Sequence, residues 1–598
     1  MSTSSSVGVA LSLLAGVGLA LGGMRVAPPG ANAASAAPQW RTALRVGMWT
    51  LWHDREVVLA PAQPAGTVTL RSCAQCATLT LADLADVRAE GDAVMFTADG
   101  RKRHADHLWL VGAVKLTAHG ESVALENPVT ISAKAGVLII VVTLPVESYV
   151  ERVVASESGP ADSLESLKAL AIVARTFALN ENHGHADYDL CDSTHCQLLH
   201  WSGNGTRRAA AHAATLATAG ETLWYRGQRA VAYFSKDCGG HTASPEEIWP
   251  GAKAVPYLPS RPDSYCAGGA GSEWASEASR AELTAALVAG GVAPPGWRQL
   301  TVSRRSESGR AITLRLDGTE VPAEAFRLAA GKALGWNRIP STWFEVSQQG
   351  DRFLFHGRGW GHGVGLCQKG AAAMASEGRT EQEILEQYFP GAQPADEATG
   401  QAWRSFAGNG FTLESLDGAD AAYLPEMEHA RAEASGRSGL NATRPFTVRA
   451  FPSTPAFREA TLAEGWVAAF AEGDWIGTQP LRTLAARHLL VDTMRHEFLH
   501  ALVERKASPK APLWLREGLV EAWSETSPAK TPSARPKLTI DEIDAALEHA
   551  TSEAESEAAH RAATWYAAQL LAHYGHAQVL EWLHSDVPTS VIPVLRQR

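Results

Sequence analysis

Apolar and polar residues alternate in short runs between residues 44 and 142, and Gly, Asp and Pro separate the runs. Alternation with a period of two residues predicts β-strands, and the separating residues favour turns. We therefore expect a β-rich N-terminal region over residues 43–143, with no candidate chemistry beyond Cys73 and Cys76. The expected strands are Leu44–Trp49, Thr67–Leu70, Thr78–Leu81, Leu108–Val111, Val129–Ile131 and Val137–Val142.

The apolar period becomes helical in the stretch Leu144–Leu179, which predicts two helices separated by a break at residues 158–160. Glu157 ends the first helix, directly after the apolar residues 153–155. A carboxylate in this place is either partly desolvated or an ordinary solvated residue at a helix end. The spacing alone favours the solvated residue.

A segment rich in Gly, Ala, Asp and Pro, residues 393–410, has no apolar period and predicts a linker. Behind it, residues 411–598 predict two strands, at 446–451 and 467–471, among mostly helical residues. The chain is therefore expected to be a multidomain α+β protein. An α+β domain would occupy residues 144–392, and a mostly α domain would follow the linker.

Length and composition agree with this organisation. A chain of 598 residues is too long for one hydrophobic core. Apolar residues make up 45% and charged residues 20%, as in an ordinary soluble globular protein. The net charge of -11 argues against a nucleic-acid partner, which would require a basic face.

The first residues differ from the rest of the chain. Val7–Gly23 is a nearly continuous apolar run, too short and too Gly-rich for a spanning helix. Ala31-Asn32-Ala33 has the pattern of a small-residue cleavage site, although no Lys or Arg precedes the run. We expect residues 1–33 to be an export signal and the protein to be periplasmic or associated with the cell envelope. An uncleaved anchor or a mis-assigned start codon is the alternative.

Seven cysteines in an exported chain predict disulfides, and the odd number leaves one thiol over. Cys73 and Cys76 lie in a turn-like loop and form either a small bridge or a separate site. Cys238 and Cys266 flank a segment rich in Gly and Pro and are expected to form a structural disulfide. Cys367 is the cysteine left over.

A group of possible metal ligands has the spacing His185-x5-Cys191-x3-His195-Cys196. Thiolate and imidazole are ligands that tetrahedral zinc prefers, and two of each complete a structural site. The spacing is not that of a standard zinc finger, so a Cys191–Cys196 disulfide is an equal alternative. His183 is a competing ligand.

Two loops have the composition of ligand-binding segments. Ser235 precedes Gly239-Gly240-His241, where the pair of glycines lets the backbone approach a ligand closely. Residues 357–365 are the most Gly-dense stretch of the chain. No register there gives Gly-x-Gly-x-x-Gly or a Walker motif, so a nucleotide site is not expected.

Several of these motifs, in this order, resemble the SpoIID/LytB family (stage II sporulation protein D, or amidase enhancer). The resemblance covers about residues 144–391 and is specific because several motifs match together. The matching motifs are the Leu-Pro and acidic-Tyr-Val helix with a Glu before a Pro-containing break, the Ala-Arg-Thr-aromatic helix, the loop Tyr188–Gln197, Tyr233-Phe234-Ser235, Cys238–His241 and Gly357–Gln368.

The resemblance implies an activity and a site. Enzymes of this family are lytic transglycosylases that cleave peptidoglycan glycan strands, and the Glu that matches Glu157 is their catalytic acid. Such proteins can carry zinc on a His/Cys set spaced like residues 185–196, which favours metal over a disulfide. For Arg175 a structural salt bridge is the alternative to glycan binding. The residues expected at the substrate groove are Arg175, Gln197, Ser235, Gly240, His241, His362 and Gln368.

In the C-terminal domain, a helix predicted over residues 484–504 carries the motif His-Glu-Phe-Leu-His at residues 496–500. Residues four apart share one face of a helix, so His496 and His500 can bind the same ion. Glu497 can then act as the base on a metal-bound water.

A second motif, Trp-Leu-Arg-Glu-Gly at residues 514–518, follows that helix. The pair of motifs, with sixteen residues between His500 and Glu517, resembles the gluzincin metallopeptidases. This resemblance implies that Glu517 is the third zinc ligand and that the fourth position holds water. Glu521, one turn later, is either a hydrogen-bond partner of a ligating His or a solvated residue.

Together these features predict an exported cell-wall enzyme with one structural and one catalytic zinc. Its first activity would cleave the bond between N-acetylmuramic acid and N-acetylglucosamine. An ordinary glycosidase needs two carboxylates, whereas a lytic transglycosylase needs one, because the C6 hydroxyl of the sugar closes an anhydro ring. Its second activity would be zinc-dependent cleavage of a peptide or protein.

Two alternatives stay open. In the first, the SpoIID-like part binds glycan without cleaving it and stimulates a separate cell-wall amidase. In the second, that part only targets the metallopeptidase to the wall. A role in sporulation does not follow from the fold, because a site defines a reaction and not a pathway.

Overall fold

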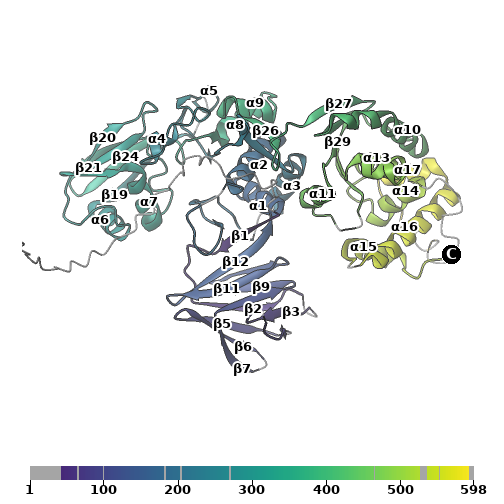
Figure 1. The fold of residues 1–598 in the computed structure, drawn as a ribbon, viewed down its shortest axis with the longest axis horizontal. Coiled ribbons are helices and arrows are strands. Elements are labelled where there is room, and N and C mark those ends of the chain that lie inside the picture. The colour runs from purple at the N-terminus through teal and green to yellow at the C-terminus, as the bar shows by residue number, and fades with distance from the viewer. Residues whose placement is uncertain are drawn as a thin grey trace, which may run out of the picture.

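The computed structural model describes residues 42–591 and 595, except 64–65, 74, 82, 99, 181–182, 203–204, 268–270, 464, 466, 525–534 and 551. The expected export signal, residues 1–33, therefore lies outside the described residues. Within the described part, no helix is long and apolar enough to cross a membrane. Figure 1 shows a central part with a β lobe below it, a mixed lobe on the left and a largely helical lobe on the right.

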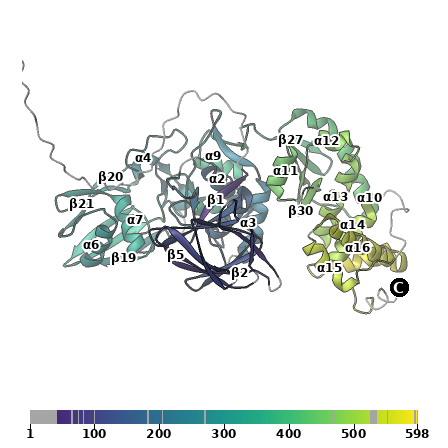
Figure 2. The ribbon, with the colours of Figure 1, turned by 60° about the horizontal axis from the view of Figure 1, so that its bottom comes forward.

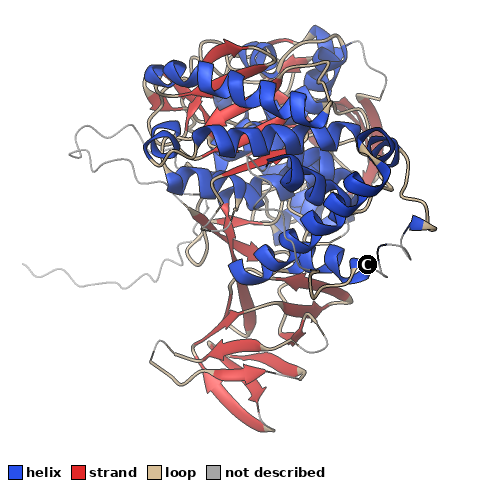
Figure 3. Ribbon diagram, turned by 90° about the vertical axis from the view of Figure 1, so that its right-hand side faces the viewer, coloured by secondary structure: helices blue, strands red, loops and turns tan. Residues whose placement is uncertain are grey.

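Strands dominate the lobe at the bottom of Figure 1, as the colouring of Figure 3 makes plain. The strand order is β13-β1-β12-β11-β8-β3-β4 in one sheet and β10-β9-β2-β5-β6-β7 in the other. The strands are β1 Ala43–Met48, β2 Glu56–Pro61, β3 Val68–Arg71, β4 Leu79–Leu81, β5 Ala85–Glu90, β6 Ala93–Ala98, β7 Arg101–Ala105, β8 His107–Val111, β9 Val114–Ala118, β10 Glu121–Leu125, β11 Val129–Lys134 and β12 Val137–Pro145. The β-rich N-terminal region is confirmed.

Strand β12 runs directly into the helix α1 at Val146, so the β lobe and the central part are continuous. Leu44 of β1, Val150 of α1 and Leu385 of α9 belong to one hydrophobic cluster. The expected boundary near residue 144 therefore does not separate two cores. The central elements are α1 Val146–Glu157, α2 Leu164–Ala178, β13 Leu190–Cys191, α3 Gly205–Ala217, β14 Glu221–Tyr225, β15 Gln228–Arg229, β16 Phe234–Ser235, β17 His241–Thr242, α4 Pro245–Ile248, β18 Arg261–Pro262, α5 Ser264–Ala267, β25 Leu366–Cys367, α8 Gln368–Ser376, α9 Glu381–Tyr388 and β26 Gln393–Asp396.

Residues 273–358 form a separate unit, here called the inserted unit, between α5 and β25. It lies on the left of Figures 1 and 2 and has a hydrophobic cluster of its own, with Phe326, Phe344 and Phe355. Residues 144–392 were expected to form one domain, so this unit was not predicted. Its elements are β19 Glu273–Ser279, α6 Arg280–Ala289, β20 Leu300–Arg305, β21 Ala311–Leu316, β22 Thr319–Pro322, α7 Ala323–Leu334, β23 Phe344–Gln349 and β24 Arg352–Arg358.

The C-terminal lobe combines one five-stranded sheet, in the order β27-β28-β29-β31-β30, with a larger number of helical residues. The expected helix at residues 484–504 is divided into α12 and α13. The elements are β27 Arg404–Gly408, β28 Phe411–Ser415, a 3-10 helix Gly418–Tyr423, α10 Leu424–Ser438, β29 Phe446–Ala450, α11 Thr454–Thr461, β30 Ala469–Glu472, β31 Trp475–Thr478, α12 Leu481–Ala486, α13 Leu490–Lys506, α14 Leu513–Ser524, α15 Ile540–His549, α16 Glu553–Tyr574 and α17 His576–His584.

The segment expected to be a linker, residues 393–410, instead contains two paired strands. Strand β26 is hydrogen-bonded to β14 of the central part, and β27 is hydrogen-bonded to β28 of the C-terminal lobe. The short connection between these two strands therefore marks the boundary.

The C-terminal lobe is attached to the central part by a buried ion-pair network. The Arg449 guanidinium contacts the Glu221 carboxylate at 2.5 Å and the Glu414 carboxylate at 2.7 Å. Leu216 of α3 packs with Phe457 of the C-terminal lobe in a small apolar cluster. A buried ion pair of this kind holds the two lobes together, because separating the partners would leave an unpaired charge buried away from water.

The cysteines differ from expectation in one respect. Cys73 and Cys76 form a disulfide, which confirms the small bridge. Cys238 and Cys266 are not bonded to each other, so that prediction is wrong. Their thiols face carboxylates instead: the Cys266 thiol donates to Asp237, and the Cys238 thiol donates to Asp263.

Candidate active-site cleft and metal centres

Glu157 is the last residue of α1, where the break at residues 158–160 turns the chain back into α2. Its carboxylate accepts a hydrogen bond of 3.2 Å from the backbone N–H of Leu198. The side-chain amide of Gln368 donates to the backbone carbonyl of Glu157 at 3.5 Å. These two contacts hold the end of the helix between the loop that follows β13 and the start of α8.

Burial raises the pKa of Glu157 from 4.5 to about 7, against the opposing effects of the Leu198 N–H, the Gln368 amide and the Lys236 charge. Desolvation disfavours the charged form of a carboxylic acid. A carboxyl group with a pKa near neutrality can both donate and accept a proton there, which is the requirement for a general acid and base.

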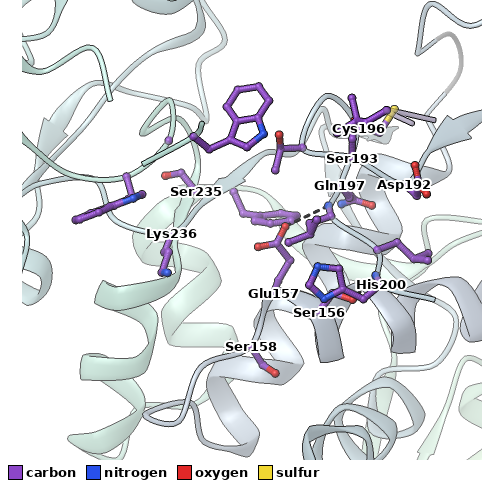
Figure 4. Close-up of a pocket in the computed structure, with 18 of the residues that line it drawn as sticks. Ser156, Glu157, Ser158, Asp192, Ser193, Cys196, Gln197, His200, Ser235 and Lys236 are labelled. Carbon is purple, nitrogen blue, oxygen red and sulfur yellow. Dashed lines mark hydrogen bonds between the residues drawn. The ribbon is translucent and has the colours of Figure 1, made fainter. Parts of the chain in front are cut away.

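Glu157 faces a cleft of about 900 Å³. In Figure 4 its carboxylate points into the space between Ser235 and Lys236 on one side and the loop from Asp192 to His200 on the other. The walls of the cleft come from three parts of the molecule. Trp49–Trp52 comes from the β lobe, residues 192–202 from the central part, and Arg327 and Trp336 from the inserted unit.

Three residues expected at the substrate groove line this cleft: Gln197, Ser235 and His362. Among the described residues, the buried hydroxyl of Ser235 has no hydrogen-bond partner. Gln197 has a different role, because its amide accepts from Tyr149 at 2.9 Å and donates to the Ala174 carbonyl at 3.4 Å. Gln197 therefore anchors the loop that presents the Leu198 N–H.

His362 is held by its neighbours. Its Nδ1 accepts a hydrogen bond of 3.0 Å from the N–H of Val364, and the ring lies 5.2 Å from that of Trp249. Burial lowers its pKa to about 4, so the ring is neutral at physiological pH. His362 lines the cleft, whereas Gln368 lies outside its lining and contacts the backbone carbonyl of Glu157.

Arg175, Gly240 and His241 lie outside the lining of this cleft. Arg175 is fully buried, and its guanidinium donates to the Glu147 carboxylate at 2.8 Å and to the Glu221 carbonyl at 3.0 Å. The expectation that Arg175 binds glycan is therefore corrected in favour of the structural salt bridge. His241 belongs to the strand β17, where its Nδ1 lies 2.8 Å from the Thr242 carbonyl.

Lys236 and the aromatic rim of the cleft were not among the expected site residues. Trp201 and Trp360 line the cleft, and Trp52 is 59% exposed while its ring stacks on His119 at 4.3 Å. Exposed aromatic faces suit sugar rings, because the C–H faces of a sugar are apolar. The Trp residues were visible in the sequence, but only the fold brings the β lobe to the same cleft as Glu157.

The ligand group predicted from residues 185–196 is assembled. The Cys196 sulfur lies 3.2 Å from both the Cys191 sulfur and the His185 Nε2, and the His195 Nδ1 lies 3.9 Å from the Cys191 sulfur. The two cysteines are not bonded to each other. His183 is not in the group; its ring stacks on Phe177 at 4.6 Å. Two thiols and two imidazoles at these distances fit one tetrahedral ion.

The His-Glu-x-x-His residues lie on α13, and Glu517 lies on the neighbouring helix α14. The Nε2 atoms of His496 and His500 are 3.0 Å apart, and a Glu517 oxygen lies 3.8 Å from His500 Nε2. Among the described residues, the ligand atoms of the His/Cys group all lie within 4.8 Å of one another, but those of His496, His500 and Glu517 do not meet this limit. This set is therefore more open than the His/Cys group.

Glu497 and Glu521 flank these three residues. Burial, and then the neighbouring Glu517 and Glu521, raise the pKa of Glu497 to about 8. Glu521 faces His560, whose Nδ1 lies 3.3 Å from its carboxylate. The Nδ1 of His496 contacts the Ser524 hydroxyl at 3.1 Å, which leaves Nε2 directed at the cavity. These residues fit a site with two imidazoles and one carboxylate.

Comparison with known proteins follows this geometry. The SpoIID family model, described as stage II sporulation protein, matches residues 134–225, and a domain of unknown function, DUF8618, matches residues 271–365. An uncharacterised protein of Brachyspira hyodysenteriae is 31% identical over 43% of this chain and 69% of its own length. The stage II sporulation protein D of Bacillus subtilis is 27% identical over 47% of this chain and 83% of its own length. The amidase enhancer of Bacillus subtilis is 25% identical over 40% of this chain and 39% of its own length.

The fold and the site define a class: multidomain α+β proteins in which a helix-end Glu with a near-neutral pKa faces an aromatic-rimmed cleft. Within that class, the chain belongs to the SpoIID family. Its similarity to stage II sporulation protein D and to the amidase enhancer agrees with this membership.

Proposed function

We propose that the protein is an exported, envelope-associated lytic transglycosylase that cleaves the bond between N-acetylmuramic acid and N-acetylglucosamine in peptidoglycan glycan strands. The observation that carries the proposal is the half-buried carboxyl group of Glu157, whose pKa of about 7 suits acid and base work in a cleft. The resemblance to sporulation protein D and to an amidase enhancer supports glycan strands as the ligand.

In the first step the Glu157 carboxylic acid gives its proton to the glycosidic oxygen, and the bond from that oxygen to C1 breaks. In the second step the resulting carboxylate takes the proton of the C6 hydroxyl of the muramic acid. The C6 oxygen then forms a bond to C1, which closes the 1,6-anhydro ring and restores the acid. The Leu198 N–H orients the carboxylate, and Lys236 stabilises its charged form between the two steps.

The other carboxylates that line the cleft support the use of a single acid. Asp192 accepts hydrogen bonds from the Trp49 N–H at 2.6 Å, the Thr50 hydroxyl at 2.6 Å and the Trp201 indole at 2.9 Å, so its oxygens are already engaged in structural contacts. Glu121 is exposed at the start of β10. Hydrolysis by two carboxylates requires a second group that faces the same bond.

The test is digestion of purified glycan strands, stripped of stem peptides, by the wild-type chain and by Glu157→Gln. We expect anhydro-muramic ends from the wild type and a loss of a hundredfold or more in the variant, as is typical of lost acid–base catalysis. Anhydro-muramic products from Glu157→Gln at the wild-type rate would refute the proposal. Wild-type protein that releases no such ends but stimulates a purified cell-wall amidase would establish the non-catalytic alternative.

We further propose that the C-terminal lobe is a zinc-dependent peptidase acting on a peptide or protein substrate. His496, His500 and Glu517 would hold the ion, which when bound supplies a Lewis acid and an acidic water. With the ion bound, Glu497, buried in the same cavity, would act as the base and would carry a proton to the leaving amine. The 3.0 Å separation of the two imidazole Nε2 atoms supports this assignment.

A further inference from the structure

Three cysteines from distant parts of the chain meet at the neck of the inserted unit. Cys238 follows β16, Cys266 lies in α5 shortly before the inserted unit, and Cys367 ends β25 shortly after it. Their sulfurs and a carboxylate oxygen of Asp263 all lie within 4.8 Å of one another. All three cysteines are 0% exposed and Asp263 is 1% exposed, so the group is enclosed.

The spacing of these atoms suits one tetrahedral ion. Zinc–sulfur bonds of about 2.3 Å place sulfurs about 3.8 Å apart around the metal. A group within 4.8 Å therefore needs only a small contraction to bind zinc. The His/Cys group at residues 185–196 satisfies the same limit.

The Cys367 sulfur is held by two backbone N–H groups. Its sulfur accepts from the N–H of Cys238 at 3.2 Å and from the N–H of Gly370 at 3.4 Å, in the first turn of α8. Backbone N–H groups at a helix N-terminus stabilise a negative sulfur. A Cβ at position 370 would lie 2.0 Å from the Tyr388 hydroxyl oxygen. The absence of a side chain at Gly370 therefore lets the first turn of α8 pack closely against Tyr388.

Asp263 is oriented toward the sulfurs by its other contacts. The Tyr388 hydroxyl donates to Asp263 Oδ2 at 2.9 Å, and the N–H groups of Tyr265 and Cys266 donate to Oδ1 at 3.1 and 3.2 Å. The Cys238 thiol contacts the same Oδ2 at 3.2 Å. Ligating carboxylates are commonly held by outer hydrogen bonds of this kind.

A disulfide does not account for this group. Three sulfurs allow one bond at most, and the third would be left as a buried thiol beside a buried carboxylate. In the structure none of the three is bonded, whereas Cys73 and Cys76 are joined. An ion satisfies all four groups at once, and the buried guanidinium of Arg310, which donates to the Cys238 carbonyl at 2.8 Å, offsets part of the negative charge.

We propose that Cys238, Cys266, Cys367 and Asp263 form a structural zinc site that joins the two ends of the inserted unit to the central part. The site is distinct from the His/Cys group and from the His-Glu-x-x-His residues. Cys367 is paired in register with Ser235 of the cleft, and Asp237 bridges to Trp360. The ion therefore also fixes the wall of the cleft that carries Ser235 and Lys236.

The first experiment uses the unmodified full chain, purified without reductant and denatured with iodoacetamide and a chelator present. We expect peptide mapping to show Cys238, Cys266 and Cys367 all alkylated, while Cys73 and Cys76 stay linked. A peptide in which two of the three are joined by a disulfide overturns the proposal. No substitution is needed for this measurement.

The second experiment measures zinc per chain. We expect Cys367→Ser and the milder Asp263→Asn to lower the zinc content, by one ion in the Ser variant. The double variant Cys191→Ser/Cys196→Ser serves as the control, since it removes the thiolates of the other site. When its zinc is exchanged for cobalt, this double variant should still show thiolate-to-cobalt charge-transfer absorption. Absence of that absorption, or zinc content unchanged in soluble Cys367→Ser, refutes the site.

Discussion

Replacing Glu157 by Gln should remove activity and, at neutral pH, make the protein more stable. The Gln keeps the volume of the side chain and can still accept the Leu198 N–H, but it cannot exchange a proton. In the wild type, the folded-state pKa is about 7 and the ordinary value is 4.5. The unfolded chain therefore loses its proton at lower pH than the folded chain does.

The sign and size of the effect follow from proton linkage. Because the folded pKa is raised, the stabilising protonation is complete below pH 4.5 and is lost as pH rises to about 7. The difference between the ordinary pKa of 4.5 and the folded-state pKa of about 7 corresponds to about 3 kcal/mol of unfolding free energy. Glu157→Gln should therefore equal the wild type in stability near pH 4 and exceed it by up to about 3 kcal/mol at pH 8.

The assay is urea unfolding followed by tryptophan fluorescence at the two pH values, since Trp49 and Trp201 line the cleft. Glu397→Gln is the matched control, because burial and the neighbouring Glu147 raise the pKa of Glu397 to about 8 outside the cleft lining. It should gain stability at pH 8 and still cleave glycan. A stability gain in Glu157→Gln that does not depend on pH would contradict the assigned pKa.

The pH profile of cleavage offers an independent check. The acid form of Glu157 starts the reaction, so the rate should fall as pH rises through about 7, approaching tenfold for each pH unit above it. A profile that stays flat to pH 9 would exclude a carboxylic acid with this pKa as the proton donor.

Three further outcomes are expected. Arg175→Ala should destabilise the protein by about 3–5 kcal/mol, because it leaves the Glu147 carboxylate buried without its partner; unchanged denaturant midpoints would refute this. Trp52→Ala should raise the KM for glycan about fivefold with kcat kept, as loss of about 1 kcal/mol of ring contact predicts; an unchanged KM excludes this Trp from the binding surface. Glu497→Gln should abolish peptide cleavage and retain zinc, whereas Glu517→Ala should lose both. Retained zinc in Glu517→Ala would place the third ligand elsewhere.

The sequence predicted what depends on local pattern. The helices at residues 146–157 and 164–178 follow from apolar spacing and from the break between them, and alternation predicted the strands β1, β3, β4, β8, β11 and β12 of the β lobe. The position of Glu157 at a helix end was visible as well. Its desolvation was not, because the atoms that bury it come from α8 and from the loop at Leu198.

Other features depend on contacts that no local pattern records. Arg175 belongs to a motif of the family, but the motif does not show that Arg175 forms an ion pair with Glu147 on the preceding helix. The second sheet of the β lobe, β10-β9-β2-β5-β6-β7, was not among the expected strands. One of its strands, β7 Arg101–Ala105, contains three basic residues in a row and shows no alternation. The pairing of Cys238 with Cys266 was inferred from nearness in sequence, whereas the fold brings in Cys367 from beyond the inserted unit.

The shared core of the β lobe and the central helices determines where this chain can be cut. A fragment that begins at residue 144 would lose β1 and nearly all of β12, whose apolar side chains share one hydrophobic cluster with those of α1. Such a fragment would be expected to aggregate. A recombinant glycan-cleaving fragment should therefore begin near residue 42 and end after β26, at the connection before Arg404. At that end the cut separates Arg449 from Glu221, and substituting Glu221 by an uncharged residue would spare the fragment an unpaired carboxylate.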